Sequence, residues 1–197
     1  MRAQLIARQR LHQGFFNLDV AEVQYETFAG VMSRPVCLEV VDRGEGVAVL
    51  MYDPDKDCLG MIRQFRVGSF LAPGNHGGWT LEMVAGACNG TTDYAQVALR
   101  EVEEEAGWQV TTLLPIHNFF LSPSGSTERL YLFLGIFDSS QPRVGGGGLA
   151  EENEDIAPLL LSYEEAWQKM DSGEIDSATA ILALQWLALN RDRLRSL

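Results

Sequence analysis

Residues 100–105, with the sequence REVEEE, form the part of the chain best suited to chemistry. On an α-helix Glu101 and Glu105 lie one turn apart on the same face. The apolar residues of the segment fall largely on the opposite face: Ala95, Ala98, Val102 and Ala106. Two neighbouring carboxylates repel each other unless a cation lies between them. Mg²⁺ and Mn²⁺ prefer a few carboxylate oxygens together with water and phosphate, so the spacing predicts a divalent-metal site.

A solvated helix face is the alternative for the same residues. Glu103 to Glu105 would then face water, and Arg100 and Glu104 would form an ordinary i,i+4 ion pair. This alternative is favoured for an isolated acidic triplet, because short motif matches arise by chance. The surroundings favour the metal site, since the helix follows a loop that begins at Gly86 and precedes Gly107, a suitable helix-terminating residue.

The composition argues against several classes of binding partner and cellular location. A chain of 197 residues can bury one substantial core with a small extra subdomain. A net charge of −12 argues against a nucleic-acid or anionic-membrane surface, because both need clustered Lys and Arg. No apolar stretch approaches the roughly 18 residues of a membrane-spanning helix, and the N-terminus lacks a signal-peptide core. The chain has three cysteines, Cys37, Cys58 and Cys88, without C-x-x-C spacing. This pattern predicts neither disulfides nor a zinc site, so we expect an unexported, cytoplasmic protein.

Two strands are expected near the N-terminus. Residues 19–28 alternate between apolar and polar types, residues 35–42 favour a second strand, and the link AGVMS is short enough for a hairpin. Residues 1–44 are therefore predicted to form a small β-rich subdomain. It has too few apolar residues to stand alone, so we expect it to pack on the rest of the chain or on a second subunit.

Strands and helices interleave in residues 45–197, which predicts an α/β or α+β domain with a mixed sheet between helices. Residues 145–148, four glycines, are the most flexible candidate. The expected elements are a hairpin of VAVLMY and CLGMIRQFR, a Gly/Pro-rich loop at 68–79, a strand TLEMVAG ending at Gly86, a helix at 93–106, strands at 113–120 and 130–137, a helix opened by a capping box at Ser162, and a helix at 178–194.

Gly86 to Trp108 resembles the Nudix box, the signature of the Nudix hydrolases. The chain has Gly, five residues, Thr92, seven residues, REV, one residue, EE, one residue, Gly and an apolar residue. Only Thr92 departs from the pattern, where the family has Glu. The resemblance implies a Nudix fold for residues 45–197 and identifies Glu101 and Glu105 as metal ligands. Because the first Glu of the box is mainly structural in the family, Thr92 leaves these ligands in place.

Three further motifs resemble the ADP-ribose pyrophosphatase branch of the family: TLEMVAG, LSPSGSTER and GLAEENEDI. The resemblance implies Mg²⁺-dependent hydrolysis of ADP-ribose to AMP and ribose 5-phosphate, with Mn²⁺ as a possible substitute. It also implies a homodimer that exchanges its N-terminal strands. One alternative is a pyrophosphatase for GDP-mannose or another nucleoside diphosphate sugar. An alternative of another class is a non-catalytic ADP-ribose sensor, which Thr92 keeps open.

The same resemblance assigns individual roles. Glu152 matches the catalytic base, and the glycines before it would let the base swing toward its water. The metal ligands are the backbone carbonyl of Ala85 and the side chains of Glu101, Glu105 and Glu154. The expected substrate contacts are Phe15, Phe16, Glu39, Arg66, Ser122, Ser124 and Glu128.

Each assignment outside the box has a simpler alternative based on composition. The segment around Glu152 and Glu154 could be a flexible acidic loop, and residues 122–126 a plain turn. Arg66, whose planar guanidinium suits a diphosphate, could form a surface salt bridge. Phe15 and Phe16 could be core residues of the N-terminal piece.

Overall fold

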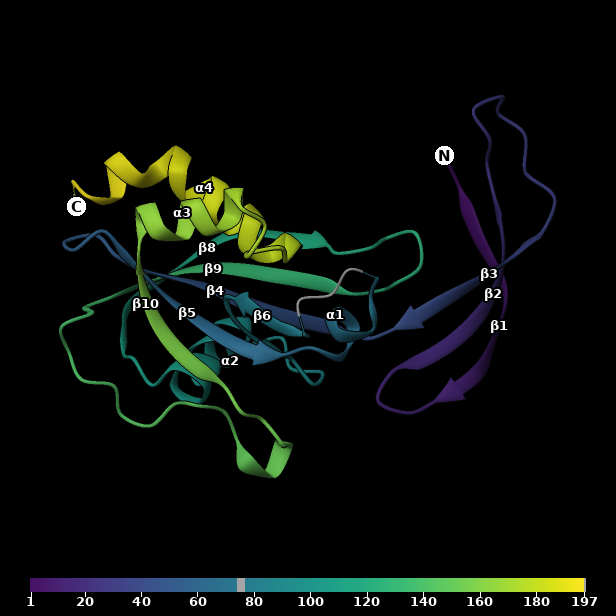
Figure 1. The fold of residues 1–197 in the computed structure, drawn as a ribbon. Coiled ribbons are helices and arrows are strands. Elements are labelled where there is room, and N and C mark those ends of the chain that lie inside the picture. The colour runs from purple at the N-terminus through teal and green to yellow at the C-terminus, as the bar shows by residue number, and fades with distance from the viewer. Residues whose placement is uncertain (74–76, 197) are drawn as a thin grey trace. The chain divides into compact units, whose positions relative to one another are not determined.

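The computed structural model describes residues 1–73 and 77–196 (Figure 1). Contacts divide the chain into two compact units. The first comprises Met1–Glu45 and Phe119–Leu130, and the second comprises Gly46–Asn118 and Tyr131–Leu197. Residues 119–130, which the sequence placed in the 45–197 domain, therefore belong with the N-terminal strands.

The first unit holds a three-stranded antiparallel sheet in the order β1 (Ala3–Gln13), β2 (Asn17–Tyr25), β3 (Val36–Asp42). The predicted hairpin is β2–β3 and is confirmed. The first strand, β1, was not predicted, because AQLIARQRLHQ has no strict period-2 alternation. Every residue of β1 is exposed, and Leu5 keeps 59% of its accessible surface. This strand therefore buries none of its apolar side chains within its own chain.

The segment 119–130 joins the first unit through the backbone of Val41 in β3. The N–H of Val41 donates to the carbonyl of Gly125 at 2.8 Å, and the N–H of Thr127 donates to the carbonyl of Val41 at 3.0 Å. The hydroxyl of Thr127 adds a hydrogen bond of 2.9 Å to the Asp42 carboxylate. These long-range contacts cannot be read from local sequence.

The second unit contains a seven-stranded sheet in the order β10-β5-β4-β9-β8, with β6 paired to β5 and β7 paired to β4. Its strands are β4 (Glu45–Asp53), β5 (Cys58–Phe65), β6 (Trp79–Glu82), β7 (Val84–Ala87), β8 (Val110–Phe120), β9 (Arg129–Phe137) and β10 (Ala157–Ser162). The antiparallel β4–β5 hairpin and the strands β8 and β9 are confirmed. The sequence did not predict β10.

The motif TLEMVAG forms two strands, where one was predicted. It is interrupted at Met83, because β6 pairs with β5 while β7 pairs with β4. The Gly/Pro-rich segment 68–79 is likewise not a plain loop, since a short helix, α1 (Val67–Leu71), occupies its start. Residues 74–76 of that segment lie outside the described residues.

Helices cover both faces of the large sheet, as predicted (Figure 1). One face carries α2 (Tyr94–Glu101) and the π-helix η1 (Val102–Ala106), and the other carries α3 (Tyr163–Asp171) and α4 (Ala178–Leu194). The capping box at Ser162 and the bounds of α4 are confirmed. A short 3₁₀ turn, η2 (Ala150–Glu152), lies in the loop before β10.

The core lies around β4, whose residues Val47–Tyr52 are completely buried. Val47, Val49 and Met51 pack in one cluster with Val97 and Val102 of the acidic helix. A central strand buried on both faces gives the helix a rigid base. No helix in the described ranges is both long and apolar enough to cross a membrane.

Candidate active site

A capping side chain opens the acidic helix, and the predicted glycine ends it. The side chain of Asp93 caps α2 by accepting from the N–H of Gln96 at 3.1 Å, and Gly107 ends η1 in the left-handed conformation with φ 70°. The predicted extent of the helix is confirmed. Its last turn is a π-helix, which the sequence did not reveal and which occurs frequently at functional sites.

The two carboxylates of this helix lie against two consecutive residues of β7. The side chain of Glu105, only 2% exposed, accepts a hydrogen bond of 3.0 Å from the N–H of Ala85. The carboxyl group of Glu101 packs on Gly86, where a Cβ atom would lie 2.0 Å from its Cδ. Gly86 is therefore needed so that the Glu101 carboxyl can reach the strand.

A solvated helix face is consequently the wrong description of Glu105. The predicted i,i+4 pair does form, since Arg100 lies 3.1 Å from Glu104, but Arg100 also lies 2.6 Å from Glu101. Of the residues expected on the buried face, Ala98, Val102 and Ala106 are buried and Ala95 is exposed. The face closest to the sheet therefore includes the carboxylates as well as the apolar residues.

Burial has a strong electrostatic effect on both carboxyl groups. It raises the pKa of Glu105 to about 8, and the neighbouring charges of Glu101 and Glu154 act in the same direction. Burial also raises the pKa of Glu101 to about 7, although Arg100 opposes the shift. Carboxylates held together with little solvent are destabilised as anions, and a bound cation removes this penalty.

The donor atoms fit a hard divalent cation. Two carboxylates and the Ala85 carbonyl can supply a few oxygens, and a magnesium-type ion takes its other ligands from water and substrate phosphates. Within residues 1–73 and 77–196, no three acidic, His or Cys side chains converge closely enough to hold an ion. The carboxylate of Glu154 instead accepts a hydrogen bond of 3.0 Å from the Leu149 N–H, so its role as a ligand stays a prediction.

The glycine run is packed against the end of the acidic helix. The N–H groups of Gly147 and Gly148 donate to the carbonyls of Glu105 and Glu104 at 2.9 and 3.0 Å. All four glycines have positive φ, and a Cβ at Gly146 would lie 2.7 Å from the carbonyl carbon of Ala106. The close approach of this segment to the helix backbone therefore explains why glycines are needed here, while their mobility stays a prediction.

The loop after the glycines carries Glu152 and Glu154 to the acidic helix. Glu152 is exposed in η2, and Glu154 is half-buried. The charges of both raise the pKa of Glu101, so the loop lies within electrostatic reach of the carboxylate pair. An exposed carboxylate can accept a proton from water, so the role of Glu152 as the general base stays a prediction.

Arg66 follows β5 and pairs with Glu82, a residue that the sequence did not single out. Its Nε and Nη2 both donate to Glu82 Oε2, at 3.0 and 2.9 Å. The side chain of Arg66 is 41% exposed, and its charge lowers the pKa of Glu105. Arg66 therefore forms a salt bridge, as the alternative predicted, and its phosphate-binding role stays a prediction.

The remaining predicted substrate contacts all belong to the first unit: Phe15, Phe16, Glu39, Ser122, Ser124 and Glu128. Phe15 is 91% exposed, so it is not a core residue. Arg43, which the sequence did not single out, lies over the ring of Phe16 at 5.2 Å and 3.0 Å from Glu128. The serine-rich loop contains a tight turn in which Ser126 N–H donates to the Ser122 carbonyl at 2.9 Å. Thr92 is exposed immediately before the helix cap.

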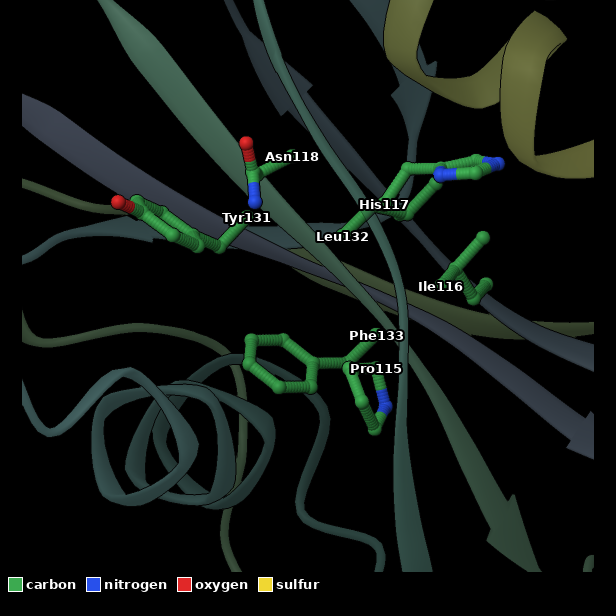
Figure 2. Close-up of a pocket in the computed structure, with 7 residues that line it drawn as sticks. All are labelled: Pro115, Ile116, His117, Asn118, Tyr131, Leu132 and Phe133. Atoms are coloured by element: carbon green, nitrogen blue, oxygen red, sulfur yellow. The ribbon is translucent and has the colours of Figure 1, made fainter.

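Two surface hollows are lined by other residues. One, of about 280 Å³, lies on β8 and β9, and Figure 2 shows the side chains around it, from Pro115 and His117 to Tyr131 and Phe133. The other, of about 540 Å³, is formed by β5, β6 and the segment between α3 and α4. None of the predicted site residues lines either hollow.

Comparison with known proteins identifies the family. The family model described as NUDIX domain matches residues 42–183. The chain is 40% identical to an ADP-ribose pyrophosphatase of Haemophilus influenzae, over 98% of this chain and 88% of that one, and 38% identical to an ADP-ribose pyrophosphatase of Escherichia coli K12, over 98% and 91%. It is also 35% identical to a GDP-mannose pyrophosphatase of an Enterobacter species, over 77% of this chain and 78% of that one.

A solved structure confirms the predicted fold class. The crystal structure of an ADP compounds hydrolase superposes with a TM-score of 0.72 over 96% of both chains, at 17% sequence identity. ADP-ribose pyrophosphatases of this family generally depend on divalent metal ions, which agrees with the donor set on α2, η1 and β7. The match of the family model and the near full-length relatives establish that the chain belongs to the Nudix hydrolases.

Proposed function

We propose that this Nudix hydrolase cleaves the diphosphate of ADP-ribose to give AMP and ribose 5-phosphate. The observation that carries the proposal is the pair of carboxylates, the buried Glu105 and the half-buried Glu101, held against Ala85 and Gly86. Relatives 38–40% identical over nearly the whole chain are named ADP-ribose pyrophosphatases, which supports this choice of substrate.

In this proposal Glu101 and Glu105 hold Mg²⁺, with the Ala85 carbonyl and Glu154 as further ligands and Mn²⁺ as a substitute. Bound cations would neutralise the diphosphate and polarise its phosphorus. Arg66 binds the diphosphate through its guanidinium, whose planar donors match phosphate oxygens. Glu152 accepts a proton from the attacking water, for which an exposed carboxylate on a loop is suited.

The first unit is proposed to supply the contacts to the nucleoside and ribose. Phe15 or Phe16 stacks on the adenine, while Glu39, Ser122, Ser124 and Glu128 make polar contacts. The exposure of β1 supports a homodimer, in which a second chain would cover the apolar residues of this strand. We propose that the N-terminal strands of two chains exchange, so that each completes the site of the other. Three cysteines outside disulfides fit a cytoplasmic enzyme.

Product analysis tests the proposed reaction. ADP-ribose is incubated with the purified protein, with and without Mg²⁺, and the products are separated by ion-exchange chromatography. AMP and ribose 5-phosphate should appear only with the cation, and Glu152→Gln should slow their release by about 100-fold or more. Tight binding of ADP-ribose without products would favour the sensor alternative. Full turnover by both Glu152→Gln and Glu105→Gln would exclude the proposed roles.

A GDP-mannose pyrophosphatase is the second candidate, because relatives with that name are 35–38% identical to the chain. Their matches cover about 77% of the chain, whereas those of the ADP-ribose pyrophosphatases cover 98%. A panel of nucleoside diphosphate sugars, ranked by kcat/KM, separates the two. ADP-ribose should rank first, and a higher kcat/KM for GDP-mannose would reverse the assignment.

A further inference from the structure

Glu82 and its neighbours form a small polar cluster where β5 and β6 run side by side. Ile62 pairs with Glu82 and Gln64 pairs with Thr80, and the N–H of Arg66 donates to the Gly78 carbonyl at 2.7 Å. Since side chains alternate along a strand, Gln64, Arg66 and Glu82 lie on one face of the sheet. The β5–β6 pairing therefore fixes the distance between the carboxylate and the guanidinium.

A single carboxylate oxygen accepts the hydrogen bonds of this cluster. Glu82 Oε2 accepts from Arg66 Nε at 3.0 Å, from Arg66 Nη2 at 2.9 Å and from Gln64 Nε2 at 3.3 Å. Two contacts from one guanidinium to one oxygen restrict rotation about the end of the arginine side chain. The other N–H groups of the guanidinium are directed away from this oxygen, because the donors of the planar group form a fixed fork.

The side chain of Glu82 is largely shielded from solvent, whereas that of Arg66 is solvent-exposed. The side chain of Glu82 is 14% exposed, whereas that of Arg66 is 41% exposed. A sheltered anion beside a phosphate-binding arginine would weaken binding of an anionic substrate unless it improved the placement of that arginine.

We propose that Glu82 is a positioning residue, which holds the Arg66 guanidinium in the orientation that meets the substrate diphosphate. The inference rests on the proposed function, since it assigns Arg66 the diphosphate. Glu82 does not touch the substrate and acts only through Arg66. The competing role is a purely structural tie between β5 and β6, which would affect stability and leave substrate binding unchanged.

A double-mutant cycle separates the two roles. Kinetics for ADP-ribose are measured for Glu82→Ala, Arg66→Ala and the double variant. Each single variant should raise KM about tenfold and change kcat less than about threefold, and the double variant should match Arg66→Ala. Glu82→Gln keeps an acceptor oxygen and should raise KM by no more than about threefold. The proposal would be overturned if the rise in KM in the double variant equalled the product of the two single rises. An unchanged KM in Glu82→Ala would also overturn it.

Glu174→Ala is the matched control for the cycle. It removes the carboxylate that pairs with another arginine of β5, since Arg63 lies 2.6 Å from Glu174 in the segment between α3 and α4. KM for ADP-ribose should stay within about twofold of the wild-type value, because this pair is not assigned to the site. An equal rise in KM would show that the loss of any ion pair on β5 is sufficient, which contradicts a specific role for Glu82.

A measurement without substrate tests the positioning itself. In ¹⁵N NMR relaxation of the free protein, the Arg66 Nε–H group should be ordered in the wild type and mobile in Glu82→Ala. An ordered Arg66 in Glu82→Ala overturns the inference even if ADP-ribose is hydrolysed. If the wild type hydrolyses no nucleoside diphosphate sugar, the proposed function fails, and the NMR result still decides whether Glu82 orders Arg66.

Discussion

The acidic helix and the N-terminal sheet differ in how completely one chain encloses them. Glu101 and Glu105 lie against β7 of their own chain, and Glu105 is almost fully buried. Strand β1, in contrast, is exposed along its whole length. The difference indicates that a single chain preforms the carboxylate pair, whereas it leaves the outer strand of the N-terminal sheet uncovered.

Glu105→Gln should have the largest effect, because it removes one charge of the buried pair and leaves the helix in place. We expect kcat for ADP-ribose to fall at least about 100-fold with Mg²⁺ present. Glu103→Gln is the control, since Glu103 is exposed on the same turn and should retain normal kcat. If Glu105→Gln keeps more than about half of the wild-type kcat, the pair is not the metal-binding centre.

Gly86→Ala tests whether the carboxylate pair depends on close approach to β7. The new Cβ would lie 2.0 Å from Glu101 Cδ, so the Glu101 carboxyl must move. We expect kcat/KM to fall about 10- to 100-fold, as for the displacement of a metal ligand. Gly68→Ala should be neutral, because its Cβ would meet nothing within 4 Å. Equal activity of both variants would contradict the dependence on Gly86.

Replacement of apolar residues on β1 tests whether the N-terminal sheet is incomplete in one chain. The double variant Leu5→Asp, Leu11→Asp should raise the dimer dissociation constant at least about tenfold, because charges would face the covering surface. Sedimentation equilibrium distinguishes the 21.8 kDa monomer from the dimer. Leu189→Asp, at an exposed leucine of α4, is the control. An unchanged dissociation constant in the double variant would place the dimer interface elsewhere.

Titration of the same β1 variant with Mn²⁺ tests whether the acidic helix is independent of the N-terminal sheet. The affinity should stay within about threefold of the wild-type value, because the carboxylate pair lies in the second unit. A large loss of Mn²⁺ affinity on dissociation would show that the pair is not preformed in a single chain.

Asp57→Asn should have the smallest effect on activity and a measurable effect on stability. Asp57 joins the β4–β5 turn to α4, since it accepts from Arg191 Nε at 2.8 Å and from the Tyr52 hydroxyl at 2.6 Å. Loss of the charge should lower the free energy of unfolding at pH 7 by about 2 kcal/mol, or several degrees in Tm. Activity should change less than about twofold.

The effect of Asp57→Asn should depend on pH in a defined direction. Hydrogen bonding from Arg191 holds the pKa of Asp57 below its ordinary value. Its contribution to stability is therefore complete above the unfolded-state pKa of about 4 and is lost as the pH falls through the lower folded-state pKa. The Tm difference between the wild type and the variant should close in acid. Asp55→Asn, at an exposed position, should show no difference at either pH.

Local signals were sufficient for many of the elements. The glycine after the acidic helix and the capping box at Ser162 act within one or two helical turns, so their effects follow from neighbouring residues. The spacing of Glu101 and Glu105 likewise placed both carboxylates on one helical face. These features depend on backbone geometry that the chain adopts locally.

Other features depended on contacts between distant segments. The split of TLEMVAG follows from pairing with two different strands, and residues 119–130 join the first unit through Val41. The partnership of Arg66 with Glu82 arises from the β5–β6 register. No local pattern distinguishes these outcomes, because strand pairing joins residues far apart in the chain.

The acidic helix shows both contributions. Its sequence places two carboxylates one turn apart, and that spacing is the same whether they face water or a strand. Packing of the helix against β7 decided between these states, because it removed water from Glu105 and brought Glu101 onto Gly86. The raised pKa values of both groups follow from this burial, which the sequence of the helix does not encode by itself.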